Sequence, residues 1–197
     1  MTLKRAGTLP LVFAAGCAFA SFKNTWRSWD TRAVVLKKDR IVVMALNMPR
    51  TSSLGVEAAA ADELRQMGFQ ASAAYEIRES VGTGKSAKAK LQNEGFATAI
   101  VFRVTTNAAE LFPTPGRYEP QDSYLSYWRW GGGWAPAPPP IESDGKVFVE
   151  TLVYSVRSDR LLWSGVSEAA SVSDVSSVAG DLVRTAISEL RNAGLIL

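Results

Sequence analysis

Histidine is absent from the 197-residue sequence, and cysteine occurs once, at position 17. Without an imidazole to accept the proton of a nucleophile, a Ser-His-Asp or Cys-His catalytic arrangement cannot form. A single cysteine cannot make a disulfide within the chain, and the common zinc sites built from Cys and His are excluded as well. We therefore expect no bound metal and no cofactor, which leaves binding or carboxylate chemistry as the open functional classes.

A strong excess of one charge is also missing. The formal net charge is +3, and two of the basic residues, Lys4 and Arg5, lie in a segment that we expect to be removed. The remaining basic residues are scattered along the chain, so the sequence predicts no nucleic-acid partner. Hydrophobic residues make up 47% of the chain, enough to bury the core of one folded domain.

The first sixteen residues have the pattern of a bacterial export signal. A basic start precedes an apolar run at 6–15, which is too short to span a bilayer. The run ends in small residues before Cys17, as in a lipobox, where the cysteine is acylated and becomes the new N-terminus; Ala14 stands where leucine is usual. We predict a lipoprotein signal peptide at 1–16 and lipid attachment, including palmitate, at Cys17.

Two other interpretations of the N-terminus remain open. The tripeptide Ala18-Phe19-Ala20 fits an ordinary signal peptidase site, and cleavage there would release a soluble periplasmic protein. A buried N-terminal helix is the third hypothesis, although Pro10 in the middle of the apolar run disfavours it. Resemblance to Gram-negative lipoproteins implies sorting to the outer membrane, because Ala18 rather than Asp follows the cysteine.

Hydrophobic periodicity predicts an α/β (α+β) domain with a mixed sheet of about five strands and three main helices. We expect the order β-α-β-α-β-(long insert)-β-β-α, with strands at 40–47, 70–77, 98–106, 146–156 and 160–168 and helices at about 51–67, 85–94 and 171–190. The first three strands should be parallel, and the last two should form a hairpin. The organisation is thus a signal peptide, a lipid-anchored tether with a short strand at 17–38, and one periplasmic domain at 39–197.

Each predicted helix ends with the same pattern, a leucine followed four positions later by glycine and then by an apolar residue. The three endings are Leu64–Phe69, Leu91–Phe96 and Leu190–Leu195. In this pattern the leucine faces the core, the glycine takes the left-handed turn, and the next side chain returns to the core. We interpret the recurrence as a shared way of ending helices rather than as a sequence repeat.

The order of these features resembles a group of largely uncharacterised Gram-negative envelope lipoproteins. The features are the lipobox, the Thr25-Trp26 segment, the strand RIVVMAL, an aromatic insert, and Leu161-Leu162-Trp163-Ser164-Gly165. The resemblance covers most of residues 12–197 and lies in pattern and order. It implies a fold similar to the small α/β domains of curli-secretion lipoproteins and to the N-terminal domain of TolB. It further implies envelope assembly or periplasmic binding, with no catalytic residues.

Two patterns could suggest catalysis or nucleotide binding, and neither is complete. Gly82-Thr83-Gly84-Lys85-Ser86 lacks the first glycine of a phosphate-binding loop, because Glu79 stands at that position, so we predict no nucleotide partner. A carboxylate-based hydrolase would need two facing carboxyl groups. The candidates are Glu76, Glu79, Glu94, Glu110 and Asp122, and the sequence gives no reason to pair any two of them.

The long insert at 108–145 is the most informative feature outside the predicted core. Its central part is crowded with aromatic residues, and we predict a binding surface formed by Tyr118, Tyr124, Tyr127, Trp128, Trp130 and Trp134. Loops of this length inside a compact domain are usually functional or disordered. Three hypotheses stay open: a lid over the sheet edge, a surface for a protein, glycan or lipid, and a disordered tract.

These observations favour a non-enzymatic outer-membrane lipoprotein that acts as an interaction or assembly module. The N-terminal lipid would bind the membrane, and an envelope protein would be the partner. The first alternative is a periplasmic domain that binds a carbohydrate or another small ligand through the insert aromatics. The second is the carboxylate-based hydrolase.

Overall fold

The computed structural model describes residues 21–27, 39–81, 85–105, 147–169 and 172–196. Six strands in this part of the chain form one mixed sheet in the order β1-β6-β5-β4-β2-β3. The strands are β1 (Asn24–Arg27), β2 (Arg40–Leu46), β3 (Gln70–Ala73), β4 (Phe96–Thr105), β5 (Val147–Ser155) and β6 (Arg160–Ala169). Strands β3 and β1 therefore form the two edges of the sheet.

The predicted strand directions are confirmed. Strand β2 pairs in parallel with both β3 and β4, and β5 and β6 form an antiparallel hairpin next to β4. The sixth strand, β1, lies in the segment 17–38 where a short strand was predicted, and it joins the sheet by pairing antiparallel with β6. The mixed α/β class is thus the observed one.

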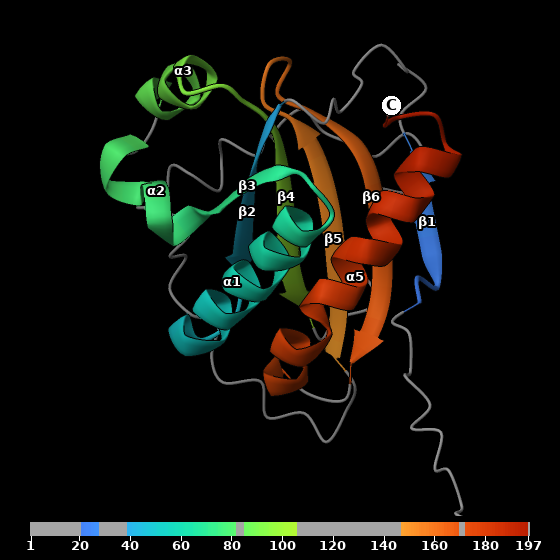
Figure 1. Cartoon of the computed structure of the whole chain (residues 1–197). Coiled ribbons are helices and arrows are strands. Elements are labelled where there is room, and N and C mark those ends of the chain that lie inside the picture. The colour runs from blue at the N-terminus through green and yellow to red at the C-terminus, as the bar shows by residue number, and fades with distance from the viewer. Residues whose placement is uncertain (1–20, 28–38, 82–84, 106–146, 170–171, 197) are drawn as a thin grey trace, which may run out of the picture.

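Two long helices cover one face of the sheet (Figure 1), and two short helices pack against part of the other face. The long helices α1 (Arg50–Gln66) and α5 (Val172–Asn192) lie together on one face, while α2 (Ala74–Val81) and α3 (Lys85–Asn93) lie toward the other. We call the apolar layer beneath α1 and α5 the first core. The layer on the opposite face is the second core.

The central strands explain why the sequence contains continuous apolar runs. In β2, Ile41 and Val43 belong to the first core, whereas Val42 and Met44 belong to the second. Successive side chains of a strand point to opposite faces, so a strand that is buried on both sides must be apolar throughout. All four of these side chains are buried.

The shared helix ending is confirmed at all three positions. In α1, the N–H of Phe69 donates to the carbonyl of Leu64 at 2.9 Å, and the N–H of Gly68 donates to Arg65 at 3.0 Å. This is the Schellman arrangement, which requires a positive φ at the glycine, here 87°. The equivalent glycines after α3 and α5 have φ values of 83° and 70°.

One local prediction was wrong. The predicted strand at 70–77 ends at Ala73, and the chain enters α2 at Ala74. Two carboxylates accept hydrogen bonds from backbone N–H groups at this junction. Glu76 accepts from the N–H of Ala73 and Glu57 from the N–H of Tyr75, both at 3.1 Å. These N–H groups therefore need no neighbouring strand as a partner.

The first long helix, predicted at about 51–67, begins at Arg50, with Pro49 in the capping position and no side-chain cap. The hydroxyl of Ser53 instead donates to the carbonyl of Arg50 at 3.0 Å. Proline suits this entry because its φ angle is already close to the helical value.

The segment before β1 is fixed to the sheet by aromatic packing at a glycine. The rings of Phe22 and Trp163 meet edge to face with centroids 4.9 Å apart. A β-carbon on Gly165 would collide with the Trp163 ring and would lie 2.6 Å from Cδ1 of Phe22. The N–H of Lys23 donates to the carbonyl of Val166 at 2.7 Å, and its ammonium pairs with Glu168. The absence of a side chain at Gly165 therefore allows residues 22–27 to dock.

This close approach predicts opposite effects of the same substitution at two glycines. Gly165→Ala should lower the free energy of unfolding by about 1–3 kcal/mol, because the methyl group overpacks the two rings. Gly180→Ala should raise it by about 0.5–1 kcal/mol, because a helical glycine is replaced without a collision; the nearest atoms to the new β-carbon are 3.6 Å away. Urea denaturation measures both, and a Gly165→Ala protein as stable as the parent would contradict the packing account.

Candidate functional sites

The residues that the sequence singled out for function lie outside the described part of the chain. They are Cys17 and the aromatic residues Tyr118, Tyr124, Tyr127, Trp128, Trp130 and Trp134. The structure does describe both strands that flank the aromatic insert. Strand β4 ends at Thr105, which pairs with Phe148 at the beginning of β5. The insert thus leaves and re-enters the sheet at neighbouring positions.

A part-buried ion pair lies next to this point. Arg103 of β4 and Glu150 of β5 are directly opposite each other, and their side chains form an ion pair. The carboxylate of Glu150 is 2% exposed, so an unpaired charge there would be costly. We did not single out this pair from the sequence. The available signal was a single charged residue within each of two otherwise uncharged strands.

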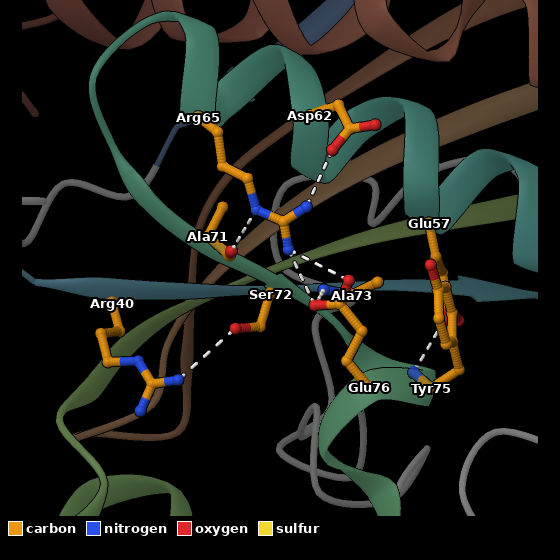
Figure 2. Close-up of polar contacts among 9 residues, drawn as sticks. All are labelled: Arg40, Glu57, Asp62, Arg65, Ala71, Ser72, Ala73, Tyr75 and Glu76. Carbon is orange, nitrogen blue, oxygen red and sulfur yellow. Dashed lines mark hydrogen bonds and ion pairs between the residues drawn. The ribbon is translucent and has the colours of Figure 1, made fainter.

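The opposite edge of the sheet carries a polar cluster, shown in Figure 2. We call Asp62, Arg65 and Glu76, with the backbone of Ala71 and Ala73, the β3-edge cluster. Nε of Arg65 donates to the carbonyl of Ala71 at 2.9 Å, and the guanidinium also contacts Glu76 and Asp62, each at 2.8 Å. Glu76 accepts from the N–H of Ala73. The cluster therefore occupies backbone groups along the edge of β3, where another strand would otherwise pair.

Glu57 joins the same region from inside the protein. Its carboxylate is buried and accepts from the N–H of Ala45 at the end of β2 and from the N–H of Tyr75 at the start of α2, both at 3.1 Å. Glu57 thus fixes two elements at once, and we interpret its role as structural.

Two ionisable groups in or beside the β3-edge cluster, Arg65 and Tyr75, have raised pKa values. The hydrogen bond to Glu76 raises the pKa of Arg65, which therefore stays cationic at any physiological pH. Partial burial, and then the charges of Glu76, Asp62 and Glu57, raise the pKa of the Tyr75 hydroxyl. Neither shift activates a nucleophile, since Arg65 keeps its proton and Tyr75 is made harder to ionise.

The carboxylates considered for hydrolysis are not brought together across a cleft in the described residues. Glu76 is held by Arg65 in the β3-edge cluster, while an oxygen of Glu94 lies 4.0 Å from Arg40. The side chains of Glu79, Glu110 and Asp122 lie outside the description. Within the described ranges, no group of three acidic or cysteine residues is placed to hold a metal ion.

A groove lies between strand β1 and the last turns of α5. Its volume is about 380 Å³, and it is lined by Thr25, Trp26, Arg27, Trp163, Glu189, Asn192 and Ala193. Thr25 and Arg27 pair with Gly165 and Trp163, so they share the sheet face that α5 covers. Trp26 alternates with them, and its ring packs on the second core. We call this feature the β1–α5 groove.

Sequence reasoning did not find the β1–α5 groove. The two tryptophans in its lining are packing residues: Trp163 is 2% exposed, and Trp26 packs partly buried against the second core. The groove joins residues about 160 positions apart, a proximity that only the tertiary fold reveals. Among the described helices, none is both long and apolar enough to cross a membrane.

The β3-edge cluster predicts a difference between two similar arginines. Arg65 and Arg184 each pair with a glutamate and with an aspartate three positions earlier, but in these contacts only Arg65 also binds a strand edge. Arg65→Ala should lower stability by about 1 kcal/mol through loss of the backbone hydrogen bond. It should also produce concentration-dependent self-association through β3, measured by light scattering after gel filtration.

Arg184→Ala is the matched control. It removes comparable ion pairs on the helix surface and should leave the protein monodisperse to the same extent as the parent. Equal self-association of the two variants would contradict the assignment of Arg65 to edge closure.

Comparisons with known proteins found similar solved structures and no sequence match. No family model matches the chain, and no curated protein matches it. Among solved structures, a PelC dodecamer from Paraburkholderia phytofirmans aligns over 80% of this chain and 90% of its own, with 16% identity and a TM-score of 0.43. A point variant of the same dodecamer aligns over 82% and 95%, with 13% identity and a TM-score of 0.44.

A third similar structure is TolB from Acinetobacter baumannii. It aligns over 77% of this chain and 29% of its own length, with 12% identity and a TM-score of 0.41. Similarities of this size assign no family to the chain. The chain's own residues form a six-stranded mixed α/β domain with one closed edge and one edge beside a groove.

Proposed function

We propose that this chain is a lipid-anchored protein of the bacterial envelope that acts as a non-enzymatic interaction or assembly module. The observation that carries the proposal is the short distance between two features of the N-terminus. The lipobox cysteine is Cys17, and the chain is already docked on the sheet at Phe22, five positions later. An acyl chain on Cys17 would thus be joined almost directly to the folded domain.

The tether would restrict how far the domain can move from the membrane. Five fully extended residues span at most about 18 Å, so the β1 edge would stay within that distance of the lipid surface. Strand β3 is five strand spacings away, about 24 Å at the usual separation of neighbouring strands. With the strand order running away from the membrane, the closed β3 edge would therefore lie on the side of the domain that is farthest from the membrane.

Multiple acyl chains on Cys17 would support stable attachment, because a single chain binds a bilayer only marginally. We propose the periplasmic face of the outer membrane as the location, since Ala18 follows the cysteine. Cleavage after Ala20 would instead release a soluble periplasmic protein, and the experiment below separates these outcomes.

Interaction is favoured over catalysis by the state of the acidic side chains. In the described ranges, Glu57 accepts two backbone amides, while Glu76 and Glu150 are held by arginines. We propose that the aromatic insert supplies the contact with an envelope protein, because aromatic side chains with polar tips are effective contact residues. Its flanking strands β4 and β5 lie in the middle of the sheet and would give it a rigid base.

Replacing the cysteine tests the anchor. Cys17→Ser should abolish incorporation of radiolabelled palmitate and should prevent recovery of an acylated N-terminal peptide by mass spectrometry. Ser21→Ala, at a nearby position not assigned to lipidation, should leave labelling unchanged. Recovery of unlipidated native protein that begins at Met1 in the cytosol would overturn the envelope proposal.

A second experiment tests the aromatic insert. Replacing Tyr118, Tyr124, Tyr127, Trp128, Trp130 and Trp134 together with serine should leave the circular dichroism of the domain unchanged and abolish cross-linking to the envelope partner. Deletion of residues 116–140 should have the same two effects. Loss of secondary structure in either variant would contradict a binding role and would make the insert part of the core.

A further inference from the structure

The β1–α5 groove carries polar side chains that the fold itself does not use. Thr25 and Arg27 line its strand wall, and Glu189 and Asn192 line its helix wall. All four side chains are exposed. None of the four forms a side-chain hydrogen bond or an ion pair with another residue in the described ranges. The polar groups of the groove are thus available to a ligand.

The two charged residues of the groove have opposite signs and do not neutralise each other. No ion pair joins Arg27 on one wall to Glu189 on the other within the described residues. The guanidinium of Arg27 can bind a carboxylate or phosphate in two-point fashion. The carboxylate of Glu189 can accept hydrogen bonds from an ammonium group. A ligand with both groups would therefore satisfy both walls.

The position of Glu189 strengthens the cationic half of this requirement. It lies in the last turn of α5, which ends at Asn192, and the carboxyl end of a helix carries partial negative charge. A carboxylate there adds to that charge, so a bound cation would be stabilised by both. Arg27 is on β1, at the opposite wall, where it can bind the anionic end.

We infer that the β1–α5 groove binds a small zwitterion, in which an ammonium group contacts Glu189 and a carboxylate contacts Arg27. Asn192 and Thr25 can donate to or accept from the ligand near either end. The volume of about 380 Å³ lies at the lower end of the range of small-molecule sites, so the ligand is of amino-acid or dipeptide size. This inference goes beyond the interaction role proposed above and does not depend on the lipid anchor.

Charge complementarity distinguishes this ligand class from two others. A simple anion would be attracted by Arg27 and repelled by Glu189. A simple cation would be attracted by Glu189 and repelled by Arg27. A neutral sugar would need an aromatic face on which to stack, but Trp163 is 2% exposed and Trp26 packs on the opposite face of the sheet. The zwitterion is the ligand class for which both charges of the groove are favourable.

The test is a titration of the full-length protein with ω-amino acids of increasing length, namely glycine, β-alanine and γ-aminobutyrate. Nuclear magnetic resonance shifts of the Asn192 amide group and the Arg27 guanidinium report binding. At least one zwitterion should bind about tenfold tighter than the carboxylate and the amine of the same length. Arg27→Gln should reduce its affinity to that of the amine, and Glu189→Gln to that of the carboxylate.

Arg191→Gln is the control, because Arg191 is exposed on the same helix turn and does not line the groove. This variant should keep the preference for the zwitterion within about twofold. The inference would be overturned if no zwitterion binds, or if zwitterions bind no tighter than the matched single ions. It would also be overturned if a neutral disaccharide binds at the groove and is insensitive to both charge variants. Lipid labelling at Cys17 is unaffected by any of these results.

Discussion

The docking of residues 22–27 against β6 is the contact on which the organisation of this protein depends. It is possible because Gly165 leaves room for the rings of Phe22 and Trp163 to meet above the strand. The same contact completes the sheet at β1, brings the N-terminal segment to one edge, and forms the strand wall of the β1–α5 groove. The proposed anchor and the proposed ligand site therefore share one structural cause.

The two edges of the sheet differ in what lies beside their backbone groups. At β3, Arg65 and Glu76 bind backbone groups that a further strand would use, and Glu57 holds the start of α2 from inside. At β1, the chain passes beside a polar groove instead. A protein with one closed edge has fewer ways to associate incorrectly, which is a general requirement for sheets with exposed strands. Because the β3 edge is occupied, contacts with a partner would be made by other parts of the surface.

The sequence predicted those parts of the fold that depend on local patterns. The three Leu-x-x-x-Gly endings, the apolar run at β2 and the hairpin of β5 and β6 were all recognisable from neighbouring residues. The segment after Ala73 was assigned wrongly, because the contact that favours α2 comes from Glu57, which is distant in sequence. Helix periodicity and strand alternation are hard to separate over so short a run.

The candidate sites were harder to predict for the same physical reason. The β1–α5 groove and the Arg103–Glu150 pair each join residues far apart in the chain, and their chemistry exists only after folding. The residues that the sequence did favour, Cys17 and the insert aromatics, are recognised by local composition, and they lie outside the described ranges. The groove and the ion pair are therefore features of the tertiary fold that no local pattern in the sequence indicates.

The central claim is that the N-terminal segment is an integral part of the domain edge. Hydrogen exchange at the amide of Lys23, which donates to the carbonyl of Val166, tests it most directly. The account predicts that this amide exchanges as slowly as the paired amides of β6, because both open only when the sheet opens. Exchange at the rate of an unstructured peptide, with β6 still protected, would contradict it and would remove the basis for both the short tether and the groove.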